Sequence, residues 1–353
     1  MQPVPPAHFS TLEYLWQQYA TQPRQLAFRA ETLAAWHAWR DALRARLLEC
    51  LGGLPAERGE LAPRVVDVSE RENYRQEKIY FYSEPGVAVP CYVLTPRDVP
   101  PPYRPVIALH GHGSDGAELL VGHAKDRAAR ANLRAYNYDY ARQLVRHGFM
   151  VFAPVQRAFG ERLERAPAFR VGVGARAKSC EMVNSVGLLF GKALAGLRVW
   201  DVMRTIDYIR TRAEPLTEKI ACLGLSGGGS VTLYTAALDE RIRLAVVAGA
   251  FCTYRASIMS IVHCPDNYVP GILRYAELAD VAGLIAPRPL LIEHGTQDPI
   301  FPIAGVRQAY RELQRVYALV GRAEDLAKDF FPGGHRFGGR KTFTWLDREF
   351  ARA

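Results

Sequence analysis

The chain has 353 residues, 49% of them hydrophobic, and can therefore bury a substantial core in one catalytic domain with an appended element. Its 45 basic and 36 acidic residues give a formal charge of +9. The basic residues are mostly arginines scattered singly, without a block of five or more, so we expect no nucleic-acid partner.

The six cysteines are widely spaced and form no C-x-x-C pair, which favours a reduced, intracellular setting. The amino terminus, MQPVPPAHFS, has neither a positive region nor an apolar region and does not resemble a secretory signal. The longest apolar stretch, 183–197, contains Asn184 and Lys192 and is too short to span a bilayer. We expect a cytoplasmic protein without a membrane partner.

Residues 10–50 repeat large apolar side chains at a spacing of three to four, which predicts two amphipathic helices that end at Gly52 and Gly53. We assign residues 1–60 to an N-terminal helical extension. Such an extension is more often a packing layer or a contact between subunits than a cofactor site. The two helices are therefore a candidate surface for a homo-oligomer.

The rest of the chain, 61–353, has the pattern of one α/β domain. The segments 78–82 and 87–94, joined by a Pro-Gly turn, predict an antiparallel hairpin. Continuous apolar runs that alternate with helical patterns predict a mostly parallel sheet with helices on both faces. Residues 155–196 and 251–288 are long enough to be cap-like insertions. The runs lie at 106–109, 149–153, 220–225, 244–250 and 290–293, and the helical patterns at 138–147, 197–212, 230–238 and 303–320.

The motif Gly224-Leu225-Ser226-Gly227-Gly228 fits G-x-S-x-G where a predicted strand ends and a helix begins. A serine on such a turn projects its hydroxyl from the sheet edge, and the flanking glycines remove β-carbons that would clash. The Gly227 amide and the helix N-terminus supply positive potential for an oxyanion. A phosphate-binding turn is the alternative, but neither of its glycine motifs is matched. Ser226 is the predicted nucleophile.

A serine nucleophile needs a base that takes its proton and a third group that holds the base in one tautomer. Asp298 follows the run 290–293, and His335 follows a short strand at 329–331, so both lie on loops after strands. The acid follows the serine and the histidine comes last, which is the chain order expected for the partners of a serine in a G-x-S-x-G turn. We predict Asp298 as the orienting acid and His335 as the general base, with Asp266 as the second choice for the acid.

The loop after the run 106–109 reads His110-Gly111-His112-Gly113-Ser114-Asp115. We expect the second oxyanion donor from the amide of His112, with Gly113 as the alternative. The two histidines also suggest the H-x-H-x-D-H pattern of binuclear zinc hydrolases. The aspartate comes one position too late, Gly116 replaces the next histidine and no third histidine is near, so we expect no metal.

These features resemble α/β-hydrolases of the dienelactone-hydrolase and acetyl-xylan-esterase-like group. The matching residues are the His110-Gly111 loop, the turn at Ser226, Asp298 and the Gly334-His335 loop, and the resemblance runs from about residue 75 to the end. The segment 155–162 also resembles the Arg-Gly-x-Gly loop of that group. Dienelactone hydrolases use a cysteine, so Ser226 points to the esterase branch.

The resemblance implies an α/β-hydrolase fold, no cofactor, an acyl-enzyme intermediate and a small-molecule ester as substrate. Peptidases, thioesterases and lactonases use the same machinery. A catalytically silent binding scaffold is the alternative from another class, but such proteins usually lack a triad residue. The candidate pocket residues are His110, Gly113, Arg157, His263 and Tyr268.

Overall fold

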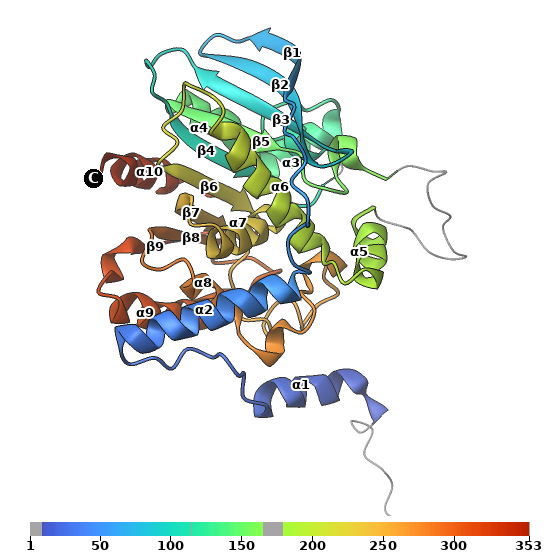
Figure 1. The fold of residues 1–353 in the computed structure, drawn as a ribbon, viewed down its shortest axis with the longest axis vertical. Helices are drawn as coiled ribbons and strands as arrows, with labels where there is room; N and C mark the ends of the chain where they lie inside the picture. The colour runs from blue at the N-terminus through green and yellow to red at the C-terminus, as the bar shows by residue number, and fades with distance from the viewer. Residues whose placement is uncertain (1–8, 114, 165–178, 353) are drawn as a thin grey trace, which may run out of the picture.

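The computed structural model describes residues 9–113, 115–164 and 179–352. Within these residues, a nine-stranded sheet crosses the molecule in the order β1-β2-β3-β5-β4-β6-β7-β8-β9 (Figure 1). Strands β1 to β3 pair antiparallel, β3 pairs antiparallel with β5, and β4 to β9 are parallel to one another. The sheet is therefore mostly parallel, and the hairpin that the turn signal predicted is formed by β2 and β3.

The strands are β1 (Arg64–Glu70), β2 (Tyr74–Glu84), β3 (Val87–Pro96), β4 (Arg104–Leu109), β5 (Phe149–Pro154), β6 (Ile220–Leu225), β7 (Ile242–Ala248), β8 (Leu290–Gly295) and β9 (Leu326–Phe331). The α-helices are α1 (Thr11–Thr21), α2 (Leu33–Cys50), α3 (Arg127–Tyr136), α4 (Tyr140–Arg146), α5 (Ser179–Leu189), α6 (Leu194–Ile209), α7 (Gly227–Leu238), α8 (Leu278–Gly283), α9 (Ile303–Leu319) and α10 (Thr342–Ala351).

The central strands send alternate side chains into two separate cores. In β4, Ile107 and Leu109 enter one core, whereas Val106 and Ala108 enter the other. Side chains of α2, α6, α7, α8 and α9 complete the first core, and those of α3, α4 and α10 complete the second. Helices therefore cover both faces. This explains why every residue of β5, β6 and β8 is buried and why these strands are unbroken apolar runs in the sequence.

Helix α2 binds the N-terminal extension to the first core. The side chain of Thr32 caps the helix by accepting a hydrogen bond from the amide of Ala35. One face is buried, with side chains at the spacing that the sequence pattern predicted. It consists of Trp36, Trp39, Leu43 and Leu47.

Helix α1 lies at the periphery (Figure 1) and buries none of its side chains. Two long-range hydrogen bonds hold it in place: Trp16 Nε1 donates to the carbonyl oxygen of Met259 at 3.0 Å, and the Tyr19 hydroxyl donates to Glu277 at 2.8 Å. The two helices expected in residues 10–50 are thus both present, although they are packed very differently.

The sequence pattern did not separate β1 as a strand. Six of its seven residues are exposed, because it forms the edge of the sheet and packs against β2 alone. Because an exposed edge strand buries neither face, its sequence shows little of the alternation between apolar and polar residues that predicts a strand.

The expected insertions are occupied in part by helices. Residues 165–178 of the first lie outside the described residues, and α5 and the start of α6 follow them; α8 lies in the second. Among the described residues no single helix is long and apolar enough to cross a membrane. Helices α5 and α6 together reach that length and apolar composition, but they are bent by 98° at the break between them. All six cysteines are free.

Candidate active site

Ser226 stands on the turn between β6 and α7. Its backbone has φ +58° and ψ −123°, a conformation that is strained for a residue with a side chain. A β-carbon on Gly228 would lie 2.0 Å from the carbonyl oxygen of Leu109, and one on Gly224 would lie 2.3 Å from the Gly228 carbonyl. Only glycine fits at these two positions. The turn therefore has the tight geometry of a nucleophile elbow.

His335 and Asp298 come together from the loops after β9 and β8. Nδ1 of His335 lies 2.7 Å from Oδ2 of Asp298. The other carboxylate oxygen accepts hydrogen bonds from the amides of Ile300 at 2.8 Å and Phe301 at 3.1 Å. These two amides fix the orientation of the carboxylate. Because a carboxylate oxygen can only accept a hydrogen bond, Nδ1 of His335 carries the ring proton, and Nε2 is left without one.

The electrostatics of Asp298 suit an orienting carboxylate. Burial opposes its ionisation, but the hydrogen bonds from His335 and from the Phe301 amide keep the pKa of Asp298 below its ordinary value. The ring of Phe301 stacks on the imidazole of His335, with ring centroids 5.9 Å apart. His335 and Ser226 line the same cavity.

A buried carboxylate fixes the loop that follows His335. Glu293 on β8 is 1% exposed and accepts hydrogen bonds from the amides of Gly338 at 2.8 Å and Gly339 at 3.0 Å and from the hydroxyl of Thr342 at 2.6 Å. Burial, assisted by the negative charge of Asp329, raises the pKa of Glu293 to about 7 despite these three donors.

This raised pKa makes the stability of the protein depend on pH. Between pH 4.5 and 7 the folded protein keeps a proton on Glu293 that the unfolded chain loses, so the free energy of unfolding falls as pH rises through this interval. The contribution is at most about 3 kcal/mol. Glu293→Gln should remove it, and urea unfolding of both proteins at pH 5 and pH 8 measures the difference. An equal gap in stability at the two pH values would contradict ionisation at this site.

The loop after β4 crosses directly over the elbow. A β-carbon on Gly111 would lie 3.1 Å from Cβ of Ser226, and one on Gly227 would lie 2.8 Å from Nδ1 of His112. The Tyr138 hydroxyl accepts the Gly111 amide at 2.7 Å. In the described part of the chain, the amides of His112 and Gly227 make no hydrogen bond. Both can therefore donate to an oxygen bound beside Ser226.

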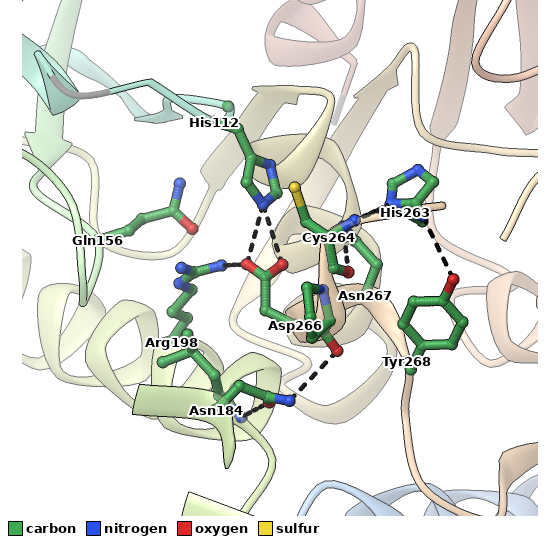
Figure 2. A network of polar contacts seen from close by, with 12 residues as sticks. His112, Gln156, Asn184, Arg198, His263, Cys264, Asp266, Asn267 and Tyr268 are labelled. Carbon is green, nitrogen blue, oxygen red and sulfur yellow. Dashed lines mark hydrogen bonds and ion pairs between the residues drawn. The ribbon is translucent and has the colours of Figure 1, made fainter. Parts of the chain in front are cut away.

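A buried ion pair holds the imidazole of His112 from below (Figure 2). Nε2 of His112 lies 3.0 Å from both carboxylate oxygens of Asp266, which is also paired with Arg198. Burial favours the neutral ring, but hydrogen bonds to Asp266 and Cys264 and the charge of Asp266 raise the pKa of His112 to about 9. Asp266, our second choice for the acid, thus contacts His112, whereas Asp298 contacts His335.

His110 and Arg157 make structural contacts. The buried His110 ring is engaged at both nitrogens: Nδ1 lies 2.8 Å from the Gly111 carbonyl oxygen, and Nε2 accepts the Gln156 amide at 3.0 Å. Burial lowers the pKa of His110 to about 3, and the neutral ring has no lone pair left for a metal. Arg157 forms a two-pronged ion pair with Asp201, at 2.8 and 2.9 Å, and contacts Glu84.

The cavity beside Ser226 has a volume of about 300 Å³. Of the predicted pocket residues, Gly113 lines it together with His112, whereas His110 and Arg157 are not among its lining residues. The sequence did not single out its other polar walls, which are supplied mainly by α3 and the segments beside it. They are Asp115, Asn132, Tyr136 and Tyr138.

A second, larger cavity of about 670 Å³ lies between α1 and residues 258–274, and its lining includes Tyr268 but not Ser226. His263 packs edge-on against Phe301, with ring centroids 5.6 Å apart, and is not among the residues that line the cavity beside Ser226. The structure therefore brings Ser226, His335, Asp298, His112, Gly227 and Gly113 together and places the other candidates outside this group.

The sheet topology and the strand-turn-helix geometry at Ser226 define the class of the protein as an α/β-hydrolase. The family model named "Abhydrolase family" matches residues 10–317, and the chain belongs to this family. The matched region includes α1 and α2, which the sequence resemblance had left outside. One relative, "Putative hydrolase YtaP" of Bacillus subtilis (strain 168), is 27% identical over 288 residues, which cover 80% of this chain and 89% of that protein.

Solved structures share the fold. A "putative acetyl xylan esterase" from Bacteroides fragilis NCTC 9343 superposes with a TM-score of 0.72 at 19% identity, covering 91% of this chain and 82% of its own. A glucuronoyl esterase from Solibacter usitatus superposes with a TM-score of 0.66 at 13% identity, covering 94% and 97%. These likenesses, at 19% and 13% identity, concern the fold alone.

Proposed function

We propose that the protein hydrolyses carboxylic esters, with Ser226 as nucleophile, His335 as general base and Asp298 as the group that orients the base. The observation that carries this proposal is the convergence of three features on one cavity: the strained elbow at Ser226, the His335–Asp298 hydrogen bond, and the amides of His112 and Gly227, which make no hydrogen bond within the described residues.

In the proposed reaction, Nε2 of His335 takes the proton of the Ser226 hydroxyl as its oxygen attacks the ester carbonyl. The amides of His112 and Gly227 donate to the oxyanion of the tetrahedral intermediate. The protonated His335 then gives its proton to the leaving alcohol, and an acyl-enzyme remains. Water, deprotonated by His335, attacks the acyl carbon; as this second tetrahedral intermediate collapses, His335 returns the proton to Oγ of Ser226 and the acid is released.

The cavity supports a compact substrate. Its volume of about 300 Å³ is at the lower end for small-molecule sites, which favours a short acyl group. The carboxylate of Asp115, the amide of Asn132 and the hydroxyl of Tyr136 can bond to alcohol hydroxyls. Two structural neighbours are named as esterases of carbohydrate derivatives. We propose short-chain esters of a hydroxylated alcohol as the substrate class.

Purified protein should be assayed against p-nitrophenyl esters from acetate to octanoate and against acetylated xylo-oligosaccharides, beside covalent labelling with a fluorophosphonate. We expect turnover to fall as the acyl chain lengthens, and peptide mass spectrometry to locate the label on Ser226. Labelling at Ser226 without ester turnover would favour peptidase, thioesterase or lactonase activity. Absence of both label and turnover would favour a binding scaffold.

A further inference from the structure

A cluster of metal-ligating side chains lies beside the candidate active site. The proposed reaction uses none of these side chains, since His112 takes part only through its backbone amide. Nε2 of His112, Sγ of Cys264 and a carboxylate oxygen of Asp266 all lie within 4.8 Å of one another. His112 comes from the loop after β4, whereas Cys264 and Asp266 flank the start of the short 3-10 helix Pro265–Asn267. Two separate segments thus supply three donor atoms.

The donors point toward one shared space (Figure 2). Sγ of Cys264 is directed to the side of the His112 ring, and Nε2 of His112 points down at the carboxylate. Arg198 approaches Asp266 from the opposite side, so one carboxylate oxygen faces Cys264. Asp266 is 4% exposed and Arg198 is 3% exposed, so the carboxylate is fixed in place by a buried partner before any cation arrives.

The donor types select the metal. Imidazole nitrogen, thiolate sulfur and carboxylate oxygen form a typical Zn²⁺ ligand set, whereas Mg²⁺ and Ca²⁺ prefer oxygen ligands alone. Zn²⁺ bonds of about 2.0 Å to nitrogen and about 2.3 Å to sulfur place tetrahedral donors about 3.3–3.7 Å apart. His112 and Asp266 are already 3.0 Å apart, so the main adjustment is a movement of the cysteine sulfur by about an ångström.

Two anionic ligands limit the buried charge. A zinc ion has two positive charges, and the Asp266 carboxylate and the Cys264 thiolate supply two negative ones, so that with Arg198 the cluster carries a net charge of +1. Zinc takes the place of the proton that His112 now shares with Asp266, while Arg198 keeps its own contact with the carboxylate. Such a contact to a ligating carboxylate commonly orients it for the metal.

We propose that His112, Cys264 and Asp266 form a zinc-binding site, with the fourth tetrahedral position left to water. Because its ligands join the loop over the elbow to the segment that follows β7, bound zinc would fasten these two segments together. The proposal does not depend on ester hydrolysis, and its test measures binding alone. It also differs from the H-x-H-x-D-H pattern rejected from the sequence, since His110 has no part in it.

The test uses the full-length, tag-free protein titrated with Co²⁺ and then with Zn²⁺. We expect a near-ultraviolet sulfur-to-cobalt charge-transfer band and strong visible d–d bands of a tetrahedral site, both removed when Zn²⁺ displaces the cobalt. In Cys264→Ser the charge-transfer band should vanish, and zinc affinity in isothermal titration calorimetry should fall at least ~100-fold. Cys50→Ser removes a partly exposed thiol outside the cluster and should behave as wild type.

Thermal unfolding gives a second measure. Zinc should raise the Tm of the wild type and of Cys50→Ser, but not that of Cys264→Ser or His112→Gln, because a ligand that binds only the folded state stabilises it. Circular dichroism confirms that the variants are folded. If the wild type gives no thiolate-to-cobalt band, or if Cys264→Ser binds zinc as tightly as the wild type does, the proposal is overturned.

Discussion

Replacing Ser226 by alanine is expected to lower kcat for the best p-nitrophenyl ester by ~10³-fold or more, with little change in KM. The reason is geometric. The strained backbone at φ +58° places this side chain at the wall of the cavity that His335 also lines. Alanine tolerates the turn as well as serine does, so the fold should survive and substrate should still bind.

Steady-state kinetics of Ser226→Ala and Ser230→Ala provide the comparison. Ser230 lies one turn further along α7, its amide donates to the Ser226 carbonyl oxygen at 2.9 Å, and its hydroxyl is outside the cavity at Ser226. The Ser230 variant should retain activity close to wild type. A Ser226 variant as active as the Ser230 variant would show that ester turnover does not pass through a serine acyl-enzyme at this elbow.

The parts of the fold that sequence reasoning found are those in which local pattern and burial agree. The parallel strands are buried on both faces and therefore appear as unbroken apolar runs. The elbow could be predicted because Leu109 approaches Gly228 too closely for any side chain, and this position is therefore occupied by glycine in the sequence. Helix α2 was found because its buried residues recur at helical spacing.

The parts that were missed depend on contacts between distant segments. Helices α3, α5, α8 and α10 are short, and much of their surface is polar or set against neighbours that the sequence does not name. Arg157 was placed in the pocket by resemblance, but the carboxylates of Asp201 and Glu84 hold it elsewhere. The pairing of Asp266 with His112 spans 154 positions. Arg198, set among apolar residues near the start of α6, was a signal that a carboxylate had to lie opposite it.

The two buried aspartates contact different histidines: Asp298 contacts His335, and Asp266 contacts His112. Asp298→Asn should reduce kcat by ~10⁴-fold, the loss expected when the orienting carboxylate of a serine triad becomes an amide. One carboxylate oxygen of Asp298 accepts hydrogen bonds from two backbone amides, and the other accepts one from Nδ1 of His335. An asparagine can present its oxygen to only one of these sides, so either the loop amides or the proton on Nδ1 of His335 loses its acceptor. The imidazole then loses the tautomer that accepts the serine proton.

Asp266→Asn is the matched comparison, because Asp266 is equally buried and also contacts a histidine. Its partner His112 contributes a backbone amide to the proposed oxyanion site, and the proton of the Ser226 hydroxyl does not pass through that ring. The loss of kcat in Asp266→Asn should therefore be much smaller than in Asp298→Asn, once thermal unfolding has shown both variants to be folded. The reverse order would transfer the role of triad acid to Asp266 and would require His112 to act as the base.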